Sequence, residues 1–93
     1  APTPLEDPGQ DVTEMYAGMV EEIRRIAEAQ DGVIECHDVR LRQVQGGLYV
    51  SLHCVCPGEF SMEDAHRCSA QVEGCLRQAF PQVTHFLVHT EPM

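Results

Sequence analysis

The chain has 93 residues and a formal charge of −9, from 15 acidic and 6 basic side chains, and 43% of its residues are hydrophobic. This length suits a single domain with a core of modest size. A protein that binds nucleic acid or an anionic membrane needs a basic surface to neutralise phosphates, so the acidic balance disfavours both partners and favours a cation.

The first ten residues predict a linker or tail, because residues 1–10 hold three of the six prolines and two acidic residues. Residues 11–93 are then expected to form one domain without internal repeats. The longest apolar runs are about five residues, far short of the ~20 that span a bilayer. The sequence shows no secretion signal, so we expect a reducing, cytoplasmic environment.

The first helix is predicted to start near Asp11 and to stop at Asp31-Gly32. Asp11 and Glu14 have the spacing of a capping box, and Asp31-Gly32 is typical of a helix C-terminus. Between them, apolar side chains recur at helical spacing and would form the buried stripe of the helix. They are Val12, Met15, Tyr16, Met19, Ile23, Ile26 and Ala27.

Two strands and a hairpin are predicted next. The first strand is expected over residues 33–44, where Val39 and Leu41 alternate with Arg40 and Arg42. Residues 45–47 are typical of a hairpin turn, and residues 48–56 alternate again as the second strand. One face of the second strand would pack on the helices, and it carries Leu48, Val50, Leu52 and Cys54. His53 would therefore point away from the core.

A second helix and a third strand complete the predicted domain. Ser61 and Asp64 have capping-box spacing, and the helix that they begin would end before Pro81. The helix would bury Ala65, Cys68, Val72, Cys75, Leu76 and Ala79. A strand from about residue 83 follows, so the predicted order is α-β-β-α-β.

This order predicts an α+β fold with two helices on one face of a three-stranded sheet, leaving the other face open. In the last strand His85, Leu87, His89 and Glu91 would share the open face. Apolar side chains are expected beside them, namely Tyr49, Val55 and Leu87. Such a face on a small domain favours a partner, most simply a second copy of the chain.

Histidines are the most informative polar residues. His53, His85 and His89 would converge on the open face if the second and third strands are neighbours. His37 begins the first strand, and His66 lies in the first turns of the second helix. Imidazole with carboxylate is a common ligand mixture for zinc. A single histidine is nevertheless more often solvated or hydrogen-bonded, so the residues alone leave both interpretations open.

The five cysteines cannot all pair within one chain, and none forms a CxxC motif. Cys68 and Cys75 would pack in the core as part of the helix stripe. Cys36 and Cys54 each neighbour a histidine but would face the opposite way, whereas Cys56 lies at a strand end and could reach a metal. No nucleophile–base pair, phosphate loop or substrate cleft is predicted, so we do not expect an enzyme.

Five short motifs occur in a distinctive order. They are His37-Asp38-Val39-Arg40-Leu41-Arg42, His53, Ala65-His66, Phe80-Pro81 and His89-Thr90-Glu91-Pro92. Together, over about residues 11–93, they resemble the cytosolic C-terminal domain of the cation diffusion facilitator transporters, which are proton-coupled exporters of zinc and related divalent metals. The resemblance implies a ferredoxin-like, metallochaperone-like fold that dimerises and binds metal at or near the dimer interface.

The resemblance also implies a binuclear site of four histidines and one bridging acid, as in the zinc-exporting bacterial members. Carried over by position, His37 and His66 would hold one metal, and His53 and His89 the other. Glu91 would be the bridging carboxylate, where many members have the shorter Asp. The longer side chain would alter the spacing of the metals.

Two further donors are candidates for the site: His85, as a supplementary ligand or a simple surface residue, and Cys56. The implied metal is Zn²⁺, with Co, Ni, Mn, Fe and Cd as other candidates. The implied partners are a second copy of the chain and a membrane transport domain in the same or another chain. The polypeptide would be either the excised cytosolic domain of a transporter, with residues 1–10 as its linker, or a free-standing copy.

We therefore expect a regulatory module in which metal ions draw two acidic protomers together. Two alternatives are left open. A metal-independent ferredoxin-like interaction domain would form a dimer that responds to neither zinc nor chelator. A soluble metallochaperone would be a monomer with one exposed, exchangeable metal.

Overall fold

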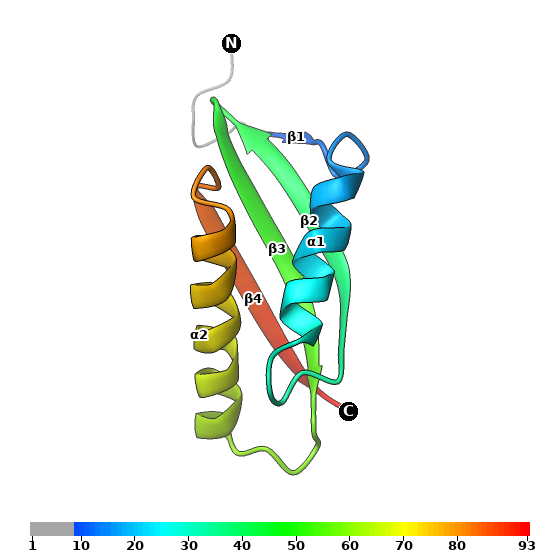
Figure 1. The fold of residues 1–93 in the computed structure, drawn as a ribbon, viewed down its shortest axis with the longest axis vertical. Helices are drawn as coiled ribbons and strands as arrows, with labels where there is room; N and C mark the ends of the chain where they lie inside the picture. Colours follow the sequence, from blue (N-terminus) through cyan, green and yellow to red (C-terminus); the bar gives the residue numbers. More distant parts are fainter. Residues whose placement is uncertain (1–8) are drawn as a thin grey trace.

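Two helices lie on one face of a four-stranded sheet in the computed structural model, which describes residues 9–93 (Figure 1). The elements are β1 (Gln10–Asp11), α1 (Ala17–Glu28), β2 (Glu35–Val44), β3 (Gly47–Cys56), α2 (Met62–Ala79) and β4 (His85–Pro92). The spatial order is β1-β2-β3-β4, with antiparallel pairing except between the parallel β3 and β4. The predicted α+β class is confirmed, with β1 as an additional strand. Residues 1–8 of the predicted linker lie outside the described residues.

The start of the domain differs from the prediction. An edge strand, β1, pairs with β2, and the Val12 amide donates a hydrogen bond to the Leu41 carbonyl at 2.9 Å. The Asp11 carboxylate accepts from the Thr13 amide at 2.9 Å, which makes a local turn. Because these backbone groups are committed to the sheet and the turn, α1 begins at Ala17 and not near Asp11.

Helix α2 begins where its capping box predicted. The Asp64 amide donates to Ser61 Oγ at 3.0 Å, and the Ser61 amide donates back to the Asp64 carboxylate at 3.2 Å. The helix connects β3 to β4, and such a crossover is what allows neighbouring strands to pair in parallel. The first turns of α2 therefore lie beside the C-terminal end of β4.

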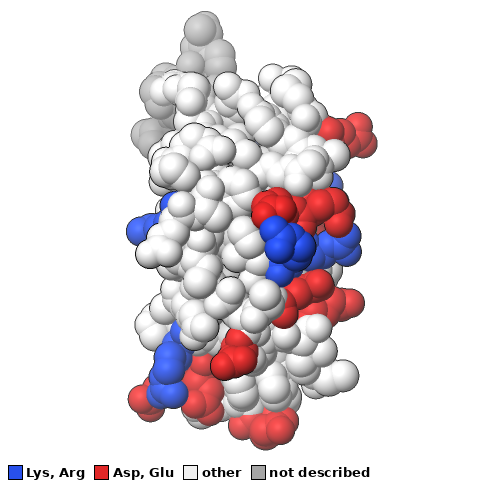
Figure 2. Space-filling view, viewed as in Figure 1, with Lys and Arg blue, Asp and Glu red and all other residues white. Residues whose placement is uncertain are grey.

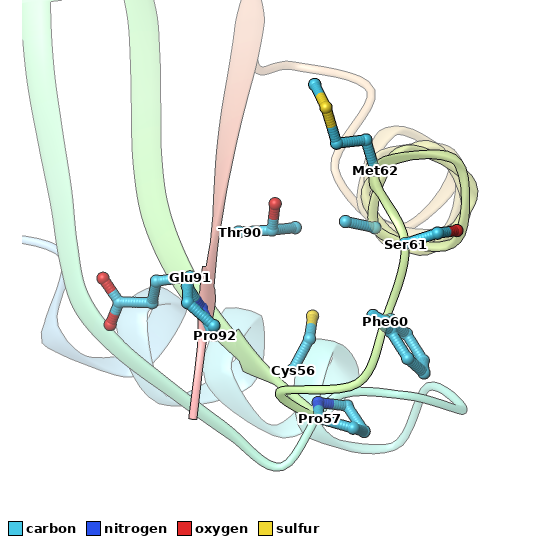
Figure 3. A pocket seen from close by; sticks show the side chains of 9 residues that line it. Cys56, Pro57, Phe60, Ser61, Met62, Thr90, Glu91 and Pro92 are labelled. Carbon is cyan, nitrogen blue, oxygen red and sulfur yellow. The ribbon is translucent and has the colours of Figure 1, made fainter.

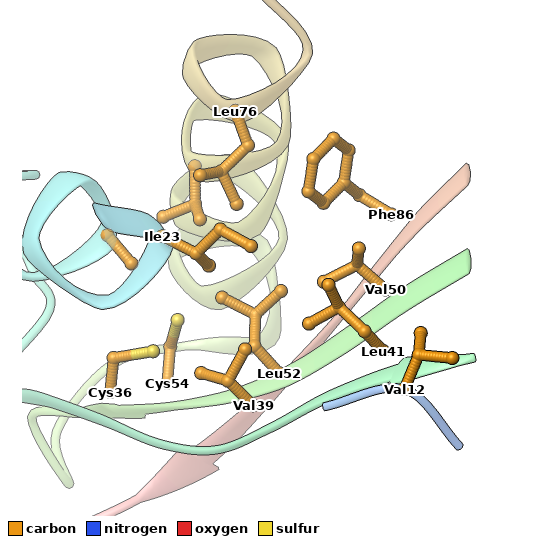
Figure 4. Close-up of a cluster of buried hydrophobic side chains, with 12 residues drawn as sticks. Val12, Ile23, Cys36, Val39, Leu41, Val50, Leu52, Cys54, Leu76 and Phe86 are labelled. Carbon is orange, nitrogen blue, oxygen red and sulfur yellow. The ribbon is translucent and has the colours of Figure 1, made fainter. Parts of the chain in front are cut away.

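The hydrophobic core fills the layer between the helices and the sheet (Figure 4). Ile23 of α1 and Leu76 of α2 pack in one cluster with Leu41, Leu52 and Phe86 of three different strands, and all five side chains are at most 1% exposed. Large aliphatic and aromatic side chains of this kind each contribute about 1.5–3 kcal/mol when buried. This packing fixes which face of every strand is turned away from the helices.

Charged side chains of both signs gather on the outer surfaces of the helices (Figure 2). Arg24 pairs with Glu21 at 2.6 Å on α1, and Arg77 pairs with Glu73 at 2.8 Å on α2. Exposed pairs of this type contribute about 0–1 kcal/mol each, so their main effect is to keep the helical side solvated.

Strand β2 contains a bulge that changes which side chains face outward. The pairing with β3 shifts register between His37 and Arg40, and Asp38 has a φ of 54°. As a result Cys36 and Val39 are both buried, while His37 and Asp38 are both exposed on the open face. Strict alternation would allow only one of those two polar residues to face outward.

Candidate metal centre

Three imidazoles form a row across the open face of the sheet. His37 of β2 is the register partner of His53 of β3, and His53 is the register partner of His89 of β4. The ring centroids of His37 and His53 are 5.5 Å apart, and those of His53 and His89 are 4.7 Å apart. Backbone pairing therefore brings together three of the four histidines in the predicted ligand set.

The Glu91 carboxylate lies against this row. It accepts a short hydrogen bond from His37 Nε2, and its Oε2 lies 3.5 Å from His53 Nδ1. The hydrogen bond favours the charged form of both partners, so it raises the pKa of His37 and lowers the pKa of Glu91. One carboxylate thus connects imidazoles from two neighbouring strands.

A second carboxylate, Asp38, reaches the row because of the bulge. Its Oδ2 lies 3.6 Å from His53 Nε2, so His53 has one carboxylate near each ring nitrogen, with Glu91 near Nδ1. The sequence alone does not predict Asp38 in this site. The available signal was the spacing of Cys36 and Val39, two apolar residues an odd number of positions apart in one strand.

The other predicted donors lie elsewhere. His66 is on the exposed side of α2, and α2 packs on the opposite face of the sheet. His85 lies at the other end of β4, where its register partner is Tyr49, so it does not converge with His53. Cys56 is 2% exposed and points to the helical side of the sheet.

The donor types in the row fit a divalent transition metal, because imidazole nitrogen and carboxylate oxygen are ordinary zinc ligands. In the described part of the chain, no three His, Cys, Asp or Glu side chains form a ready-made metal cluster. In the row, His37 and Glu91 are hydrogen-bonded to each other. A metal would need neutral imidazoles and would have to replace that hydrogen bond.

The family model for the cytoplasmic domain of cation efflux proteins matches residues 17–93. The chain belongs to this family. The cation efflux domain is therefore a cytoplasmic dimerisation domain from a family of transporter regulatory domains, and not an enzyme. Within the described residues it has no helix long and apolar enough to cross a membrane. No curated protein matches the chain.

Solved structures of MamM resemble the cation efflux domain. One MamM variant is 20% identical, with 84% of this chain and 98% of that chain covered and a TM-score of 0.76. A variant of the MamM CTD is 22% identical, with 84% and 99% covered and a TM-score of 0.75. At this level of identity the likeness establishes the fold, which is the predicted ferredoxin-like arrangement.

Proposed function

We propose that this domain binds divalent transition metal ions, zinc first among them, and that the bound metal favours a closer dimer through the open sheet face. The observation that supports this is the row of His37, His53 and His89, held in register across three strands beside Glu91. In a full transporter such closure would bias the membrane domain, whereas a free-standing copy would buffer or sense metal.

The ligand assignment follows the family resemblance and is part of this proposal. His53 and His89 would hold one metal, and His37 and His66 the other, with Glu91 as the bridging carboxylate. The contacts of Glu91 with both His37 and His53 support the bridging role, because these two histidines belong to different metals in the assignment.

His66 is the donor that the row lacks. Its neighbour Ala65 lines a cleft together with Thr90 and Glu91, between the start of α2 and the end of β4 (Figure 3). His66 therefore lies at the same end of the domain as the row. Since β4 is the edge strand and α2 packs behind it, His66 can join the other donors only around that edge.

Charge supports a dimer that depends on metal. Each chain carries −9, so two chains carry −18 (twice −9), and metal-free protomers repel each other. Four divalent ions would offset nearly half of that charge. Tyr49 and Leu87, which are 39% and 47% exposed on the same face, add apolar surface that a second copy can cover.

Calorimetric titration of the protein with zinc at neutral pH tests the proposal, with sedimentation in zinc and in chelator run beside it. We expect binding at micromolar or lower concentrations and a shift toward dimer. His89→Ala should weaken binding strongly, whereas His85→Ala should not, because His85 is on the same strand and face but opposite Tyr49. Zinc binding no tighter than the millimolar range would refute the proposal.

The same measurements separate the two alternatives. A dimer unaffected by zinc or chelator would indicate a metal-independent interaction domain, and the exposed Tyr49 and Leu87 are the feature that favours it. A monomer with one exchangeable ion would indicate a soluble metallochaperone.

A further inference from the structure

Two buried thiols face each other on the helical side of the sheet, away from the histidine row. Cys56 is the last residue of β3, Cys68 lies on α2, and their Sγ atoms are 4.0 Å apart. They are 2% and 6% exposed. The Cys68 thiol also points at the Asp31 carbonyl, at 3.7 Å, so the pair is held by weak S–H contacts only.

Both thiols border clefts that open at the surface. The sulfur of Cys56 lines a cleft of ≈ 170 Å³ between α2 and β4, with Met62 at its rim (Figure 3). Cys68 lines a second cleft of ≈ 170 Å³, and Phe60 borders both clefts. Met62 is one of the residues that line the cleft of Cys56, and it is 91% exposed. Each thiol of the pair therefore borders its own surface cleft, from which a small ion can approach.

The separation of the two sulfurs suits a bound metal better than a disulfide. With metal–sulfur bonds of about 2.3 Å, two thiolates on one ion are roughly 3.8 Å apart in a tetrahedral arrangement and roughly 4.6 Å apart in a linear one. The observed 4.0 Å lies between these values. A disulfide needs about 2.05 Å, so the sulfurs would have to approach by about 2 Å.

We propose that Cys56 and Cys68 form a second metal site, for a soft ion that accepts two thiolates, of which Cu(I) is the chief example. Sulfur ligands favour Cu(I), whereas zinc favours four ligands, and the described residues supply no third Cys, His or carboxylate to the pair. On binding, two S–H bonds are replaced by two S–Cu bonds, and two protons leave to solvent. The site does not use the donors of the histidine row.

The energetics of the thiols favour the same class of ion. Burial, with the neighbouring Cys68, raises the pKa of Cys56 to about 11, so an ion has to displace a proton to bind at neutral pH. This proton release makes binding depend on pH, and ions with a strong preference for sulfur displace the proton most readily. Cys36 and Cys54 are register partners in β2 and β3, and they form a second buried pair with which the first can be compared. Both are at most 1% exposed, and neither lines the cleft of Cys56 or that of Cys68.

The test is an anaerobic titration of the reduced protein with Cu(I) in competition with bicinchoninate, followed by X-ray absorption. We expect one Cu(I) per chain with sulfur-only coordination. Cys56→Ser and Cys68→Ser should each weaken binding at least tenfold, whereas Cys75→Ser, on the same helix and half-buried, should retain it. His53→Ala should also retain it, so failure of this site and failure of the zinc proposal are distinguishable.

A measurement on the unaltered protein keeps the proposal testable if a serine variant does not fold. Cysteine labelled with ¹³C at Cβ is followed by NMR while Ag(I), a redox-inert substitute for Cu(I), is added. Shifts at Cys56 and Cys68 would support the site. Shifts at Cys36 and Cys54 instead, nitrogen in the copper coordination, or no binding in competition with bicinchoninate would overturn it.

Discussion

Asp38→Asn is the sharpest test of how the bulge serves the candidate metal centre. Asp38 lies 3.6 Å from His53 Nε2, while Glu91 lies 3.5 Å from His53 Nδ1. If a metal takes the Nδ1 side, the proton on Nε2 faces the Asp38 carboxylate, and this negative charge makes the imidazole a better donor. Asn has the same shape without the charge, and it tolerates the positive φ of 54° at this position.

Loss of such an outer carboxylate typically lowers metal affinity about 10–100-fold, which corresponds to roughly 1.4–2.7 kcal/mol. The assay is zinc calorimetry at neutral pH in the presence of a competing chelator. Glu14→Gln is the matched control, because it removes the same charge from an exposed carboxylate outside the histidine row, in the turn between β1 and α1. Asp38 has no such role if Asp38→Asn binds zinc within about twofold of the original protein, or if Glu14→Gln loses as much affinity.

Four more outcomes are expected. Because Glu91 raises the pKa of His37, protons should begin to displace zinc at a higher pH than the ~6.5 of a free imidazole, as calorimetry across pH would show. Without metal, the His37–Glu91 pair stabilises the fold at pH values between the lowered pKa of Glu91 and the raised pKa of His37. The free energy of unfolding in urea should therefore fall as the pH rises through the pKa of His37. Ser61→Ala should cost about 1 kcal/mol in urea unfolding, by removing the cap of α2. Phe86→Ala should cost about 3–5 kcal/mol, whereas Leu87→Ala should leave folding nearly unchanged and weaken the dimer in sedimentation.

Much of the fold was predictable because local signals agreed with the tertiary structure. Alternation in the last strand separates the buried Phe86 from the exposed Leu87 and His89, as the structure shows. The Ser61 capping box predicted the start of α2. These signals are periodic or involve specific hydrogen bonds, so few neighbouring residues suffice to define them.

Other features depend on contacts that the local sequence does not encode. A two-residue edge strand has no periodicity, so the sequence does not reveal β1, and the predicted helix start at Asp11 is wrong. The prediction that His85 converges with His53 is wrong, because His85 pairs with Tyr49. The register of the parallel strands β3 and β4 depends on α2 and on the core, which the local sequence does not encode. Asp38 lies beside His53 because of the bulge in β2. In the sequence, the bulge is indicated only by the break in alternation between Cys36 and Val39.

The parallel pairing of β3 with β4 makes the histidine row a product of the finished fold. His53 and His89 meet only after α2 has crossed between their strands, so the unfolded chain cannot present them together. An ion that binds only the folded chain stabilises it by mass action, by about 2.7 kcal/mol at a hundredfold excess over its Kd. If zinc binds the row, the lifetime of this domain against proteolysis becomes a measure of the free zinc around it.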